Sequence, residues 1–136
     1  MDTALLADLV DRDLDTSQGV LVVIDGARAL RKAVRDVLGT KTPIQRCIRH
    51  KERNVQDHLP ERDRASVRRR LRRAWARDDH DQAREELAVL ASELERSHPG
   101  AAASLREGLE ETLTITRLGA RGTLKRTLQS TNRASR

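Results

Sequence analysis

The chain has 136 residues, enough for one domain, and it contains one Trp but no Phe or Tyr, so its core must be built from Leu, Val, Ile and Ala. The net charge is +6 and the first fifteen residues are acidic, so the basic remainder favours an anionic partner, nucleic acid first, although a GC-rich genome also enriches Arg. The single cysteine excludes an internal disulfide, and the absence of a long apolar run or a signal segment predicts a cytoplasmic protein with no membrane partner.

The first predicted elements mix helix and strand. Apolar residues share one face of residues 3–10, which predicts a helix. Residues 20–24 form an unbroken run of Val, Leu and Ile, as expected of a strand covered on both faces. A helix over 27–38, which ends at Gly39, and a short strand over 43–47 follow. The two strands and the helix between them predict one βαβ unit, with the right-handed crossover that is usual for such units.

The remainder of the chain has only helical periodicity. The predicted helices cover 48–59, 61–77, 79–97 and 101–113. Apolar residues become sparse after Leu118, and we expect the last dozen residues to be loosely ordered. The fold class is therefore α/β, with a βαβ part within 1–47, an all-helical part over 48–118 and a C-terminal part over 119–136.

Asp25 directly follows the first predicted strand. In open α/β sheets, catalytic and ligand-binding groups gather at the carboxyl ends of the strands. A carboxylate held there suits Mg²⁺, which takes one or two carboxylates together with phosphate oxygens. The same Asp could instead cap the following helix, and spacing alone favours the cap slightly.

Cys47 and His50 form a Cys-x-x-His pair at the start of the first helix of the helical part. A structural zinc site needs four ligands, which one cysteine and scattered histidines do not supply. We therefore favour a buried Cys beside a His of the helix over a metal site. A catalytic Cys-His pair is weaker still, because no third orienting group is visible.

The predicted helix over 61–77 contains eight arginines. They stand at positions 62, 64, 68, 69, 70, 72, 73 and 77. Arg68, Arg69, Arg72 and Arg73 are the candidate contacts to a DNA backbone, because Arg binds phosphate bidentately. A solvated face with nearby acids as counter-charges is an equally good interpretation. Trp75, on the apolar stripe, is expected to anchor the core.

Five segments, read in order, resemble one family. They are ALLADLVDR at 4–12, VLVVIDGARAL at 20–30, QRCIRHKERNV at 45–55, DHLP at 57–60 and TLQSTN at 127–132. Each segment is weak evidence alone, but their order and spacing together are specific. The chain resembles the middle of a Mutator-type insertion-sequence transposase over almost its whole length.

The resemblance implies a ribonuclease H-like catalytic core interrupted by a helical insertion. Three acidic residues of the family hold two divalent metals, Mg²⁺ or Mn²⁺, for phosphodiester cleavage and strand transfer on DNA. Asp25 corresponds to the second acid, which favours the metal role over the cap. Cys47 and His50 correspond to a motif that opens the insertion, and we interpret them as structural.

Departures from the family pattern predict a truncated, inactive fragment. The first acid would lie upstream of Met1, as would the DNA-binding region, and Ser135 stands where the third acid, a Glu, would follow Ser-Thr-Asn. With one acid of three, we expect no nuclease activity alone. A sheet cut to two strands would leave Val20, Val22 and Val23 facing solvent on at least one side. Stability would then be marginal and could depend on association with another copy or with full-length transposase.

Two further hypotheses belong to other classes. A small basic DNA-binding or interaction protein acting through residues 61–77 predicts salt-dependent binding to duplex DNA. An autonomous metal-dependent hydrolase predicts Mg²⁺-dependent turnover that Asp25→Asn abolishes.

Overall fold

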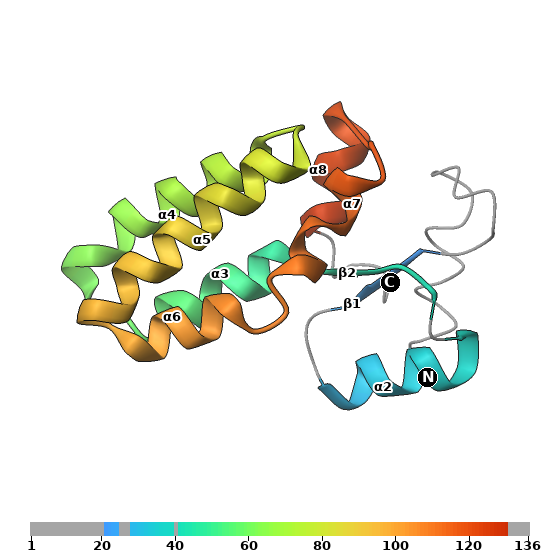
Figure 1. The fold of residues 1–136 in the computed structure, drawn as a ribbon, viewed down its shortest axis with the longest axis horizontal. Coiled ribbons are helices and arrows are strands. Elements are labelled where there is room, and N and C mark those ends of the chain that lie inside the picture. Colours follow the sequence, from blue (N-terminus) through green and yellow to red (C-terminus); the bar gives the residue numbers. More distant parts are fainter. Residues whose placement is uncertain (1–20, 25–27, 40, 131–136) are drawn as a thin grey trace.

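The computed structural model describes residues 21–24, 28–39 and 41–130. The helix predicted over 3–10, Val20, Asp25 and Ser135 lie outside these residues. The described part is mainly helical, with one small sheet, as Figure 1 shows.

The predicted parallel pairing is confirmed. β1 (Val22–Ile24) and β2 (Ile44–Arg46) pair in parallel, with Val22 opposite Ile44 and Ile24 opposite Arg46. α2 (Arg28–Leu38) connects them, and Gly39 follows it at a φ of 106° that favours glycine. The carboxyl ends of both strands therefore lie at one edge of the sheet.

Four helices come next along the chain, and the first three lie close to their predicted bounds. They are α3 (Ile48–Gln56), α4 (Glu61–Ala76), α5 (His80–Ser97) and α6 (Pro99–Arg106). Pro60 precedes α4, and the side chain of Asp79 caps α5 by accepting a hydrogen bond from the Gln82 backbone (3.0 Å). α4 and α5 lie side by side in Figure 1. No helix in the described ranges is long and apolar enough to cross a membrane.

The prediction of one continuous helix over 101–113 is wrong, because the helix is interrupted in the middle of this range. α6 ends at Arg106, and a 3₁₀ helix, η1 (Glu110–Leu113), begins after a turn at Gly108. Gly108 has a φ of 68°, and a Cβ there would collide with the guanidinium of Arg46. Glycine is needed both for the turn and for the close approach of Arg46.

The end of the described chain is also more ordered than its sparse apolar residues predicted. η1 leads into α7 (Thr114–Arg117), and α8 (Gly122–Ser130) follows. Residues 125–130, which we expected to be loose, therefore belong to a helix. Residues 131–136 are outside the described part.

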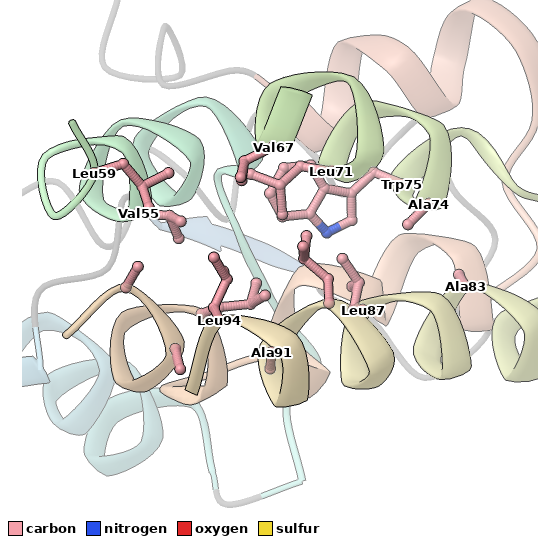
Figure 2. Close-up of a cluster of buried hydrophobic side chains, with 14 of the residues drawn as sticks. Val55, Leu59, Val67, Leu71, Ala74, Trp75, Ala83, Leu87, Ala91 and Leu94 are labelled. Atoms are coloured by element: carbon pink, nitrogen blue, oxygen red, sulfur yellow. The ribbon is translucent and has the colours of Figure 1, made fainter. Parts of the chain in front are cut away.

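The helices share one apolar core. Figure 2 shows Leu71 and Trp75 of α4 directed toward Leu87 and Ala91 of α5. Trp75 is 1% exposed, and its Nε1 donates a hydrogen bond to Thr112 Oγ1 at 3.0 Å. The prediction that Trp75 anchors the core is confirmed.

A second apolar cluster covers the sheet and corrects an expectation. Val22 and Val23, which we expected to face solvent on one side, are both buried. Leu21 and Val23 pack against Ile115, Ala120 and Leu128 from α7, α8 and the turn between them. Residues of the C-terminal segment thus cover the side of β1 that carries Leu21 and Val23.

Trp75→Ala should destabilise the chain strongly. It removes the largest buried side chain and the hydrogen bond to Thr112, at a cost of about 3–5 kcal/mol. Urea unfolding followed by circular dichroism measures the change. Val37→Ala, at a position 70% exposed on α2, is the control and should change stability by less than about 0.5 kcal/mol. Equal effects of the two substitutions would contradict the assignment of Trp75 to the core.

Candidate functional site

The candidate site begins at the carboxyl edge of the sheet. There the backbone N–H of Cys47 donates to the carbonyl of Ile24 at 2.7 Å. Asp25 comes next in the sequence but lies outside the described residues, so its metal and cap interpretations both stay predictions.

Cys47 and His50 flank the start of α3. Cys47 is buried, whereas His50 is partly exposed and its buried Nδ1 has no hydrogen-bond partner. The described residues contain no group of three His, Cys, Asp or Glu side chains that could hold a metal ion. The zinc alternative therefore gains no further ligand from this part of the chain, and the structural role of the pair stays a prediction.

Gln45 connects the second strand to the segment after α6. Its buried amide nitrogen donates to the carbonyls of Arg46 (2.7 Å) and Thr112 (2.9 Å), and its oxygen accepts from the Ile115 backbone (2.8 Å). Nearby, the Thr114 hydroxyl donates to the carbonyl of Ile44 at 2.6 Å. These side-chain hydrogen bonds attach η1 and α7 to β2.

Two buried cations share one carboxylate beside this connection. Arg46 donates from both terminal nitrogens to Glu107, at 2.8 and 3.0 Å. Lys51 donates to the same carboxylate (3.1 Å) and to the carbonyls of Ser104 (2.7 Å) and Glu107 (2.6 Å). The side chains of Arg46 and Lys51 are 4% and 2% exposed, so both charges depend on these partners.

The shared carboxylate has a strongly shifted pKa. The hydrogen bonds from Arg46, with those from Lys51 and both positive charges, lower the pKa of Glu107 from the ordinary 4.5 to about 2 against the opposing effect of burial. Burial is the largest influence on Lys51 and lowers its pKa below the usual range. Glu107 is therefore ionised at all physiological pH values.

Glu111 joins α2 to the same region. Its carboxylate lies 2.9 Å from Arg31, 3.7 Å from Arg35 and 3.4 Å from Arg46. One carboxylate thus connects the crossover helix, the second strand and η1.

Sequence reasoning missed this group of charges. Gln45 and Arg46 lie within a predicted strand. A charged side chain in a short buried strand needs a partner of opposite charge, so Arg46 was the available signal. The partners Glu107 and Glu111 are more than sixty residues away along the chain. No local spacing identifies them.

The four candidate DNA contacts of α4 do not share one environment. Arg68 and Arg72 both pair with Glu52 of α3, at 3.7 and 3.0 Å. Arg73 lies 4.0 Å from Glu86 of α5, and Arg69 is exposed without an ion pair to the described residues. The counter-charges therefore come from α3 and α5 and not from the acids that flank α4 in sequence.

Arg70 of α4 and Arg77, which directly follows α4, connect this helix to α5. Arg70 pairs with Glu93 at 2.6 Å, and Arg77 pairs with Glu86 at 2.7 Å. Part of the positive charge of α4 is thus used within the fold. The remaining outward charge can still meet a phosphate backbone, and the DNA-binding role of Arg68, Arg69, Arg72 and Arg73 stays a prediction.

Glu107→Gln should change how stability depends on pH. Because the pKa of Glu107 is lowered on folding, its contribution is complete above about pH 4.5 and is lost as the pH falls toward 2. The variant should lose about 1–3 kcal/mol at pH 7, because Arg46 and Lys51 keep buried charges with fewer acceptors. Its stability should also fall less steeply than that of the unchanged chain between pH 4.5 and 2. Chemical unfolding at a series of pH values measures both effects.

Glu95→Gln is the matched control for that experiment. Glu95 pairs with Arg106, and both side chains are about half exposed. Its removal should leave the acid dependence nearly unchanged. Identical pH profiles for the two variants would contradict the role given to Glu107.

Comparison with known proteins identifies the family. The family described as "Transposase, Mutator family" matches residues 2–136. The transposase for insertion sequence element ISRM5 of Rhizobium meliloti (strain 1021) is 34% identical over 98 residues, which are 72% of this chain and 24% of that transposase. The chain therefore spans about a quarter of the length of this curated relative. Because the match covers nearly the whole sequence, the chain belongs to the Mutator family of transposases.

Proposed function

We propose that the chain is part of a transposase that moves an insertion element, with DNA as its substrate. Membership of the Mutator family carries this proposal. The parallel pairing of β1 with β2 supports it, because the residue after β1 is Asp25 and the carboxyl edge of such a sheet is where catalytic groups gather. We further propose that residues 1–47 belong to a ribonuclease H-like core and residues 48–118 to a helical insertion.

The described residues do not by themselves fit a two-metal centre. They contain no group of three potential metal ligands, and Asp25 is the one acid that the family resemblance assigns to the centre. We therefore assign no catalytic step to a metal here. We propose that these 136 residues alone do not cut or join DNA, and that they associate with each other or with an intact transposase.

The purified chain should show no cleavage or strand transfer. Supercoiled plasmid and labelled DNA duplexes, incubated with Mg²⁺ or Mn²⁺, provide the measurement by gel electrophoresis. The unchanged chain and Asp25→Asn should be equally inactive. Metal-dependent nicking that Asp25→Asn abolishes would instead establish an autonomous hydrolase.

The DNA on both sides of the gene tests membership of an insertion element directly. We expect coding sequence for a strand and an Asp upstream, coding sequence for a Glu downstream, and inverted repeats around the whole. Sequencing the locus measures this at little cost. Unrelated intact genes without such sequences would contradict the proposal.

A second candidate function is DNA binding through α4 alone. The observation in its favour is Arg69, which is exposed and has no ion pair with the described residues, beside the outward parts of Arg68, Arg72 and Arg73. This function predicts that Arg69→Gln with Arg73→Gln weakens salt-dependent duplex binding. It requires no catalytic acid.

A further inference from the structure

Two exposed arginines of α3 lie beside the arginines of α4. Arg49 and Arg53 are four residues apart in α3, so their side chains stand on the same side of this helix, one turn apart. Both are exposed, and neither forms an ion pair with the described part of the chain. α3 packs against α4, and Arg49 lines the same pocket as Glu52 of α3 and Arg72 of α4. Both helices therefore contribute positive charge to the surface that they share.

Few carboxylates oppose this charge. Glu52 is the one acid within α3, and the acids of α4 are Glu61 and Asp63 in its first turn. At 1.5 Å per residue, that turn lies roughly 14 Å or more along the helix from Arg72. Asp57 directly follows α3 and forms no ion pair with the described residues. The surface between α3 and α4 therefore carries more positive than negative charge and favours an anion.

Glu52 holds Arg72 by one edge of its guanidinium. Nε of Arg72 donates to Oε1 of Glu52 and Nη2 donates to Oε2, both at 3.0 Å. A guanidinium has five N–H donors, so this pair leaves both N–H groups of Nη1 and one of Nη2 along the outer edge of the fork. The side chain of Arg72 is 65% exposed, whereas that of Glu52 is 17% exposed. The carboxylate thus supports the arginine from the protein side, and the outer edge is accessible to a ligand.

Two other arginines of α4 differ from Arg72 in this respect. Arg70 donates from Nη1 and Nη2, its outer edge, to both oxygens of Glu93, at 2.6 and 3.3 Å. A carboxylate therefore already occupies that fork. Arg73 is 67% exposed and lies 4.0 Å from Glu86, too far for a hydrogen bond that would fix its direction. Arg72 combines a fixed guanidinium with an open outer edge.

We propose that α3 and α4 together bind the phosphate backbone of DNA, with Arg49, Arg53 and the outer edge of Arg72 as the contacts. The two N–H groups at that edge match two oxygens of one phosphate, and such contacts read no base sequence. Glu52 is a positioning residue: it fixes the plane of Arg72 before DNA binds, so less side-chain freedom is lost on binding. The inference rests on the proposed DNA substrate and differs from binding through α4 alone, because it requires α3.

Two double variants of the 136-residue chain test the contribution of α3. Arg49→Gln with Arg53→Gln removes both exposed arginines of this helix. Lys41→Gln with Arg117→Gln is the matched control, because these two cations are also exposed and also form no ion pair with the described residues. Fluorescence anisotropy with a labelled duplex of arbitrary sequence measures affinity over a range of salt concentrations, and circular dichroism verifies that each variant is folded.

We expect the α3 variant to bind roughly tenfold or more weakly. The slope of log affinity against log salt should become shallower by about 2, because two phosphate contacts are lost. The control should bind as the unchanged chain does.

Two lysine substitutions keep the charge and test the positioning by Glu52. Arg72→Lys replaces the fixed fork with a single ammonium group, so binding should weaken about threefold or more while the salt slope stays the same. Arg73→Lys, at a similarly exposed position, should change affinity by less than about twofold, because the guanidinium there is not held by a hydrogen bond. The same anisotropy measurement applies to both.

Four results would overturn the inference. If the α3 variant binds as the unchanged chain does, α3 is not part of the DNA-binding surface. If the control loses as much affinity as the α3 variant, binding follows net charge alone. If Arg72→Lys and Arg73→Lys have equal effects, Glu52 does not position Arg72 for phosphate. If the unchanged chain shows no salt-dependent binding, this surface holds no DNA, while the sequence around the gene still decides whether the chain belongs to an insertion element.

Discussion

The position of the sheet relative to the helices depends on the bidentate pair between Arg46 and Glu107. Arg46 is the last residue of β2, and Glu107 directly follows α6. Lys51 binds the same carboxylate from α3, so three segments meet at one acid. Neither cation can remain buried without acceptors, because an unpaired charge in the interior is far more costly than a paired one. The sheet and the helices are therefore held in one relative position by charge as well as by apolar packing.

Local patterns in the sequence were enough to predict the helices and strands but not to predict how they pack together. The run from Val20 to Ile24 and the helical periodicity of residues 48–97 predicted a βαβ unit and three helices, because burial on one face repeats with the period of each structure. The interruption at Gly108 was missed, and the side chain of Arg46 that lies against this glycine comes from a strand distant in sequence. The burial of Val23 was also missed, because Leu128, which packs on it, is distant in sequence and comes close only in the folded chain. For the site, the roles of Cys47 and His50 stay predictions, and the carboxylate that binds the neighbouring Arg46 and Lys51 is remote from them in sequence.

The arginines of α4 show how composition and surface charge can differ. Eight arginines in the predicted helix fitted equally well a face that binds a DNA backbone and a solvated face with nearby acids as counter-charges. In the structure, Glu52, Glu86 and Glu93 pair with five of them from neighbouring helices. Exposed pairs of this kind add little stability each, but they lower the net charge that a polyanion meets.

The cover that α7 and α8 provide for β1 has a consequence for biosynthesis. Leu21 and Val23 leave the ribosome early, whereas Ile115 and Leu128, which pack on them, are among the last described residues to emerge. Until then, an apolar face of the strand stays uncovered on the nascent chain, a state that promotes association with other chains. The helices from α3 to α6 can form in the meantime from contacts nearer in sequence. Translation that stops before α7 would therefore release a polypeptide with a completed helical part and an uncovered sheet.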